Sequence, residues 1–285
     1  MQISVRCWSF AALALVTAGP SLAQGTISLG DAQFVRTASS WDSSPEANLR
    51  GVSLPLTDDH LYEFGWWFRV AGDTQETPFP FPDSQSYDAD QSDLSWNNVG
   101  GRSLFSAFES AGISTGNGDT NGHVYVWLTI LNLSAVNPLT LEIFNLADFD
   151  LQPTVANDTA RLVEWTPLGI LQLNDAGENF AQYSASRQSG SPIHYLVRPY
   201  GANDVGAVLS DASITDFDDS GTPFGPGDFT AGWQFSITVA PSAMVTLAVY
   251  LRVNLGYNCS LNNGTGLFCD GLELGNPSLW SAAVP

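Results

Sequence analysis

The chain has 285 residues and a formal charge of −20, from 29 acidic and only 9 basic side chains. All of the basic residues are arginines, and this balance argues against a nucleic-acid partner, because phosphate contacts need clustered cations. Hydrophobic residues make up 44% of the chain and aromatic residues 12%, so disorder is excluded and a sizeable core can be buried.

The first 23 residues have the pattern of a secretory signal peptide. Arg6 supplies the positive start, residues 8–17 form a short apolar run, and Ser21-Leu22-Ala23 place small residues before the expected cleavage point. The run is shorter than a membrane span, and we expect no transmembrane segment after the signal is removed. The sequence therefore predicts a protein that is secreted or held at the cell surface, or that stays in the periplasm.

Several later segments alternate between apolar and polar residues with a period of two, which is typical of half-buried strands. The strongest are 61–70, 122–131, 233–239 and 245–253, and weaker candidates are 26–29, 139–144, 161–173 and 193–198. The segments 233–239 and 245–253 flank a turn, so they predict a long antiparallel hairpin with one solvated face. Residues 47–54 and 103–111 are expected to form short turns, since neither sustains a helical repeat.

These patterns predict an all-β fold, an antiparallel two-sheet β-sandwich with jelly-roll or immunoglobulin-like connections and few or no long helices. They do not fix the order of the strands. We expect one domain over 24–257, with an acidic, proline-rich insertion near 77–102. Pro78, Pro80 and Pro82 exclude a central strand in that insertion, which therefore reads as a long loop.

Residues 258–285 form a separate tail. After cleavage of the signal only Cys259 and Cys269 remain, and an even pair in an oxidising compartment predicts a disulfide that closes this tail.

The tail also carries a motif. Residues 267–281 read LFCDGLELGNPSLWS. This segment resembles the D-G-F-E-S-G-x-x-S-x-W tail of exported proteins of Gram-negative bacteria, from which Leu272 and Leu274 depart. The resemblance implies export or a surface context and no particular activity. Residues 59–76 resemble only a recurrent stretch of uncharacterised exported bacterial proteins.

One strand face contains candidate ligand-binding residues. Glu63, Trp67 and Arg69 alternate along 61–70 and therefore share a face. If that face is solvated, the indole could stack on a sugar ring or on a side chain of a partner. If a second layer covers the face, Trp67 belongs to the core and Glu63 pairs with Arg69 or with groups on neighbouring strands.

Acidic loops contain candidate calcium ligands. Asn117, Asp119 and Asn121 have the i, i+2, i+4 spacing of oxygen ligands that opens a calcium loop, although no acid stands at the twelfth position of an EF-hand. Asp216 and Asp218 begin a second acidic loop. Calcium is thus a candidate cofactor, and the alternative for both loops is a plain solvated turn.

Motifs for catalysis are scarce. Residues 112–116 form a literal G-x-S-x-G, but the polar sequence around it favours a glycine-rich loop over a nucleophile elbow. No two of the three histidines are spaced as a metal site requires. We therefore expect a non-enzymatic protein with a surface-structural, adhesion or ligand-binding role, whose partners are glycans or cell-surface components and which could self-associate. The alternative is a secreted polysaccharide hydrolase with paired carboxylates, for which the candidates are Glu63, Glu76, Glu142 and Glu164.

Overall fold

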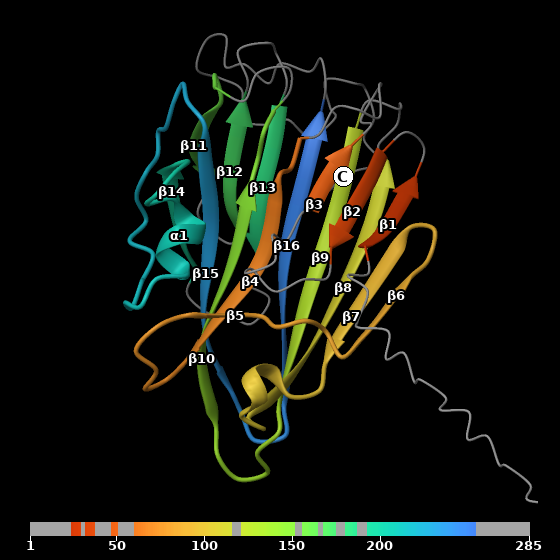
Figure 1. Ribbon diagram of the computed structural model, residues 1–285, viewed down its shortest axis with the longest axis vertical. Coiled ribbons are helices and arrows are strands. Elements are labelled where there is room, and N and C mark those ends of the chain that lie inside the picture. The colour runs from red at the N-terminus through yellow and green to blue at the C-terminus, as the bar shows by residue number, and fades with distance from the viewer. Residues whose placement is uncertain are drawn as a thin grey trace, which may run out of the picture.

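The computed structural model describes residues 24–29, 32–37, 47–50, 60–115, 121–151, 156–164, 168–174, 180–186 and 193–254 (Figure 1). Almost all regular structure in these ranges is antiparallel strand, together with one short helix, α1 (Val205–Leu209), and one 3-10 turn, η2 (Val99–Gly101). The predicted all-β sandwich is confirmed. No helix in this part of the chain is long and apolar enough to cross a membrane.

One layer of the sandwich is an eight-stranded sheet. In order, its strands are β11 (Thr159–Glu164), β12 (Leu168–Asn174), β13 (Phe180–Ser186), β16 (Met244–Asn254), β9 (Asn121–Asn132), β8 (Phe105–Thr115), β7 (Gln91–Trp96) and β6 (Ser84–Tyr87). β8, β9 and β16 are the longest of these strands, and they form the middle of the sheet.

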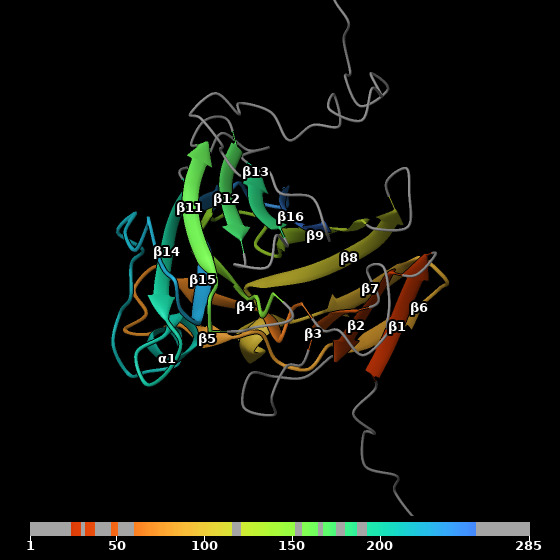
Figure 2. The same ribbon diagram turned by 90° about the horizontal axis from the view of Figure 1, so that it is seen from above.

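A five-stranded and a three-stranded sheet make up the other layer, and Figure 2 shows the eight-stranded sheet curving around them. The five-stranded sheet contains, in order, β14 (Ile193–Pro199), β15 (Phe229–Val239), β10 (Leu139–Asp148), β4 (Glu63–Val70) and β5 (Thr77–Pro78). The three-stranded sheet contains β1 (Gln24–Leu29), β2 (Ala32–Thr37) and β3 (Ala47–Arg50).

The core lies between the two layers because alternate residues of each strand point inward. β4 contributes Phe64, Trp66 and Phe68, all of them buried, and the facing strands contribute mainly aliphatic side chains. The rings of Phe68 and Phe105 meet edge to face, with their centroids 5.3 Å apart. Burial of this many apolar side chains is the main force that stabilises the sandwich.

Two buried polar contacts cross the core and link the layers. The indole Nε1 of Trp66 on β4 donates to Glu109 on β8 at 2.6 Å. The hydroxyl of Tyr183 on β13 donates to Asn145 Oδ1 on β10 at 2.6 Å, and the Asn145 amide donates to the carbonyl of Gly65 at 3.0 Å. A buried polar group is costly unless it is paired, so these contacts favour one alignment of the layers over others.

The predicted hairpin of 233–239 and 245–253 was wrong. β15 pairs with β10 and β14, whereas β16 pairs with β9 and β13, so the chain crosses from one layer to the other between them. The side-chain amide of Asn132 donates to the carbonyls of Val239 and Ala240 and holds this crossover. Alternation tells which side of a strand is buried, but it does not identify the neighbouring strand.

The segment 77–102 is not a loop. It contains β5, the hairpin of β6 and β7, and η2. The prolines do exclude a central strand at Pro78, because Pro78 lies on β5 at the edge of its sheet. The expected short turns were also wrong where the structure describes them, because β3 occupies 47–50 and β8 occupies 105–111. On β8 the buried Glu109 obscures the apolar pattern.

The outer face of the five-stranded sheet is itself covered. α1 and residues 210–228, here called the cover, lie against it. Trp67, Phe144 and Leu196 from the sheet pack with Val205, Leu209 and Phe217 from the cover. The rings of Phe144 and Phe217 meet edge to face at 5.3 Å. This explains why β4 and β15 are buried on both sides for much of their length.

Candidate functional sites

The structure separates the three predicted ligand-binding residues of β4. Trp67 is fully buried beneath the cover, so the alternative of a covered face applies and its indole offers no surface to a ligand. Glu63 begins the strand, and Arg69 lies six positions further along it. The two charged groups therefore belong to different surroundings, one at each end of the covered face.

Arg69 ties the cover to the sheet. Its guanidinium forms ion pairs with Glu76 and Asp216 and donates to the carbonyl of Thr215 at 3.0 Å. Glu76 in turn accepts from the backbone N–H of Thr215 at 3.1 Å. Gln234 on β15 donates to Asp216 as well, at 3.2 Å. These contacts indicate that Arg69 and Glu76 hold the fold together.

The structure does not bring the predicted calcium residues that it describes together into one site. Asp216 belongs to the Arg69 network. Burial raises the pKa of Asp216, but the hydrogen bond and the charge of Arg69 lower it by more, so the net pKa is below the ordinary value. Asp218 accepts a hydrogen bond from Ser220. Asn121 begins β9 opposite Asn254, and Asn117 and Asp119 lie outside the described residues.

The described residues include only some of the other features that the sequence predicts. Residues 112–115 lie within strand β8, so the G-x-S-x-G segment begins as strand, not as a glycine-rich loop. The signal peptide, the pair Cys259 and Cys269, and the tail motif lie outside the described residues.

The outer face of the eight-stranded sheet carries a row of aromatic side chains, here called the aromatic face, in which three are exposed and the last is half-buried: Phe108, Tyr125, Trp127 and Tyr250. Phe108, Tyr125 and Trp127 are 44%, 39% and 37% exposed. The rings of Tyr125 and Trp127 are parallel to within 8°, with their centroids 5.8 Å apart, and Tyr250 lies 4.7 Å from Tyr125. Large aromatic groups are seldom left exposed together without a binding role.

Small side chains flank Trp127 and keep it accessible. The residues directly opposite it on the neighbouring strands are Ser110 and Ala248. A Cβ atom built on Gly112 would lie 4.0 Å from the indole, at ordinary contact distance. The sequence places Tyr125 and Trp127 on one side of a strand, but only the register shows what surrounds them.

A polar hollow adjoins the aromatic face. It has a volume of about 190 Å³ and lies over β6, β7 and β8. Its lining residues are mostly small and polar, with Phe108 at one side: Ser84, Gln85, Ser86, Asp93, Leu94, Ser95 and Phe108. Aromatic surface and hydroxyl-bearing surface therefore meet on the same sheet.

His123 borders the aromatic face and has an unusual pKa. Burial, together with the charge of Arg252, lowers the pKa of His123 to about 4. Its ring packs edge to face on Tyr250 at 5.7 Å, and its buried Nε2 has no hydrogen-bond partner among the described residues. The folded state therefore holds His123 neutral.

This pKa predicts a pH-dependent loss of stability. An unfolded His takes up a proton near pH 6.5, whereas folded His123 resists protonation until about pH 4, so its contribution is lost as the pH falls. Relative to His123→Phe, the wild type should lose roughly 2 kcal/mol of unfolding free energy between pH 7 and pH 5. Urea denaturation of both proteins at several pH values measures the difference. Parallel curves would contradict the assignment.

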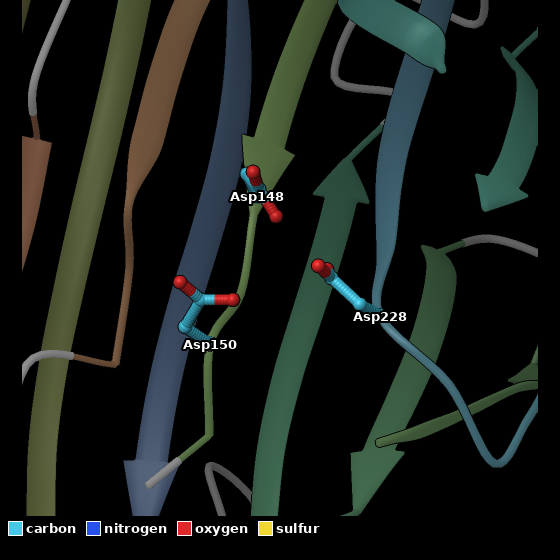
Figure 3. Close-up of side chains that lie close together, drawn as sticks. All are labelled: Asp148, Asp150 and Asp228. Atoms are coloured by element: carbon cyan, nitrogen blue, oxygen red, sulfur yellow. The ribbon is translucent and has the colours of Figure 1, made fainter. Parts of the chain in front are cut away.

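Three carboxylates gather at the end of the covered face, and are here called the carboxylate cluster: Asp148, Asp150 and Asp228 (Figure 3). One ligand oxygen from each lies within 4.8 Å of the others. Asp148 ends β10, Asp150 follows it, and Asp228 immediately precedes β15. The pairing of β10 with β15 brings these residues together across about 80 positions of sequence.

The cluster is strongly acidic. Burial raises the pKa of Asp148 well above its ordinary value, and the charges of Asp150, Glu63, Asp228 and Asp204 raise it further. Burial, together with the charges of Asp204 and Asp150, likewise raises the pKa of Glu63 to about 7. Such a set of hard oxygen donors could hold a metal ion.

Sequence reasoning missed the carboxylate cluster. The only local signal is the i, i+2 spacing of Asp148 and Asp150 after a predicted strand. The third member could not be found without knowing which strands are neighbours.

Comparisons with known proteins give a likeness in fold alone. No family model matches the chain, and no curated protein matches it. A bacterial glucoamylase solved in complex with acarbose superposes with a TM-score of 0.53 at 10% identity; the match covers 92% of this chain and 38% of the glucoamylase. A galactose mutarotase-like protein from Lactobacillus casei gives a TM-score of 0.42 at 9% identity, covering 81% of this chain and all of that one.

Proposed function

We propose that this chain is an exported, non-enzymatic protein that binds neutral glycans through the aromatic face of its eight-stranded sheet. The observation that carries this proposal is the row of exposed Tyr125 and Trp127 with the half-buried Tyr250, in which small residues flank Trp127. The C–H face of a sugar ring is apolar and packs on an aromatic ring, while its hydroxyl groups need hydrogen-bonding partners around it.

The surroundings of the row supply such partners. On β7 and β8, Gln91 donates to Asp93 and to Ser110, which places amide, carboxylate and hydroxyl groups beside Trp127. On the middle strands, Thr129 and Thr246 share a hydrogen bond of 3.0 Å. These side chains, together with the serines of the hollow, form a polar border around the aromatic row. Such a border favours a hydroxyl-rich ligand.

The charge of the chain narrows the class of glycan. A formal charge of −20 repels polyanions, so a neutral polysaccharide fits better than an acidic one. The likeness in fold to part of a glucoamylase solved with acarbose is consistent with a carbohydrate ligand. Surface-structural and adhesive roles of the protein would follow from binding such a polymer.

The variant Trp127→Ala tests the proposal. Binding of the purified protein to a panel of neutral polysaccharides is measured by sedimentation with insoluble polymers and by affinity electrophoresis with soluble ones. Removing the exposed indole should weaken binding at least about tenfold, since aromatic anchors dominate binding sites of this kind. Tyr200→Ala is the matched control, because Tyr200 is 52% exposed and directly follows β14, in the other layer. This variant should bind the glycan as well as the wild type does.

Two outcomes would contradict the proposal that the aromatic face binds glycans. Equal binding by wild type and Trp127→Ala would exclude the aromatic face as the glycan site. Light scattering that shows self-association of the wild type but not of Trp127→Ala, with no glycan retained, would assign the face to contacts between copies of the chain.

The alternative function, polysaccharide hydrolysis, would use paired carboxylates. Two of the candidate acids already have structural partners: Glu76 binds Arg69, and Glu142 accepts hydrogen bonds from Gln234 and Ser236. Glu63, with its raised pKa, lies beside the carboxylate cluster on the other layer from Trp127. Release of reducing sugar by the wild type, abolished in Glu63→Gln, would favour the hydrolase over the binding protein.

A further inference from the structure

Asp148 has an environment that hydrogen bonding within the described residues does not explain. Its side chain is 1% exposed, and its Oδ1 is buried with no hydrogen-bond partner there. The Oδ1 of Asp228 is likewise buried and unpaired among these residues. A buried carboxylate without partners is among the costliest groups in a protein, so such positions occur where a cation or a proton compensates.

The arrangement of the three carboxylates favours a cation. Their side chains converge on a common space from the end of β10 and from the start of β15 (Figure 3). Like charges placed this close repel one another. A divalent cation bound between the three carboxylates would attract each of them and so compensate for their mutual repulsion.

The spacing admits calcium, and the type of ligand favours it. Two ligands of one ion cannot lie farther apart than twice the metal–oxygen distance, which is about 4.6–5.2 Å for calcium and about 4.0–4.2 Å for magnesium. The ligand oxygens lie within 4.8 Å of one another, which is inside the limit for calcium. Carboxylate oxygens are also the ligands that calcium prefers, whereas zinc favours nitrogen and sulfur.

We propose that Asp148, Asp150 and Asp228 form a calcium site that joins the end of β10 to the start of β15. The backbone around it is already fixed, since the carbonyl of Asp148 accepts from Tyr62 N–H at 2.8 Å and that of Asp228 accepts from Tyr200 N–H at 3.0 Å. The ion would therefore stabilise the chain segments that frame one end of the five-stranded sheet. The site is independent of the aromatic face, which belongs to the opposite layer.

Thermal unfolding of the full mature chain tests this site. Protein treated with a chelator is melted with calcium chloride, with magnesium chloride, and with potassium chloride at matched ionic strength. Calcium should raise Tm by roughly 5–10 °C at a concentration about 100 times its Kd, and magnesium should raise it less. Calorimetric titration gives the Kd directly.

The variant Asp148→Asn gives the most specific signature. Without calcium its Tm should equal or exceed that of the wild type, because one buried charge is removed, yet the rise caused by calcium should be lost. If Asp148→Asn fails to fold, Asp150→Asn and Asp228→Asn, whose side chains are half-buried, should each weaken calcium binding at least about tenfold. Asp218→Asn is the control and should keep the full response.

Two results would overturn the site. One is the absence of calcium binding by the wild type at millimolar concentration. The other is a calcium response that survives in Asp148→Asn, Asp150→Asn and Asp228→Asn, which would move the ion elsewhere. Neither result bears on the glycan proposal, because that rests on Trp127 and its neighbours.

Discussion

Replacing Arg69 with methionine should lower the free energy of unfolding by about 3–5 kcal/mol. The side chain of Arg69 is 11% exposed and that of its partner Glu76 is fully buried, so the substitution leaves a buried carboxylate without its cation. Methionine keeps much of the apolar contact with Phe144, whose ring lies 5.7 Å from the guanidinium carbon. Urea denaturation monitored by tryptophan fluorescence measures the loss.

Two companion variants separate the ion pair from other effects. Arg69→Met combined with Glu76→Gln should recover part of the stability, because the buried charge is removed as well. Asp216→Asn should cost less than about 1 kcal/mol, since the Asp216 side chain is 63% exposed. A cost below about 1 kcal/mol for Arg69→Met would show that Arg69 does not hold the cover on the sheet.

Substitution of Gly221 by alanine should cost about 3 kcal/mol or more. Gly221 has a φ of +92°, and a Cβ atom there would lie 1.9 Å from the carbonyl oxygen of Val197 on β14. The neighbouring Ser220 carbonyl accepts from Val197 N–H at 3.1 Å, so this close approach fastens the cover along β14. Displacing it should expose Trp67 and shift the tryptophan emission to longer wavelength before global unfolding.

Gly72→Ala is the matched control for backbone strain. Gly72 has a similar φ of +97°, but nothing lies within 4 Å of a Cβ placed there. Its substitution should cost about 1 kcal/mol, from the backbone alone. Equal costs at the two positions would mean that the contact between Gly221 and β14 contributes nothing.

The sequence predicts strands best where one side faces the core and the other faces solvent. β9 is such a strand, with Val124, Val126 and Leu128 inward and Tyr125 and Trp127 outward, and the alternation over 122–131 locates it well. β8 was missed because its inward side carries Glu109, which a pattern of apolar residues does not anticipate. The pairing of Glu109 with Trp66 requires both layers and is invisible in either segment alone.

Neither the pairing of the strands nor the burial of Trp67 beneath the cover could be predicted from the sequence, and both for the same reason. Whether Trp67 is exposed depends on Val205, Leu209 and Phe217, which lie 138 to 150 positions away along the chain. The carboxylate cluster likewise requires that β10 and β15 be neighbours. Local periodicity reports the surroundings of a side chain only as buried or exposed, so contacts distant in sequence need the strand order.

The sequence alone predicts only part of the aromatic face. Alternation places Tyr125 and Trp127 on one side of their strand and Tyr250 on one side of its own. The register between β9 and β16 then sets Tyr250 directly opposite Tyr125 and Ala248 opposite Trp127. Without that register, three aromatic residues from two separate strands do not define a surface.

Hydroxyl-radical footprinting with a bound glycan tests the binding face most directly. The protein is oxidised with and without a neutral polysaccharide that it retains, and modification is quantified by mass spectrometry at each aromatic residue. Tyr125, Trp127 and Phe108 should be protected by the ligand, while Tyr200 should be modified equally in both samples. Protection of Tyr200 with unchanged oxidation of Tyr125 and Trp127 would place the glycan on the other layer and contradict the account.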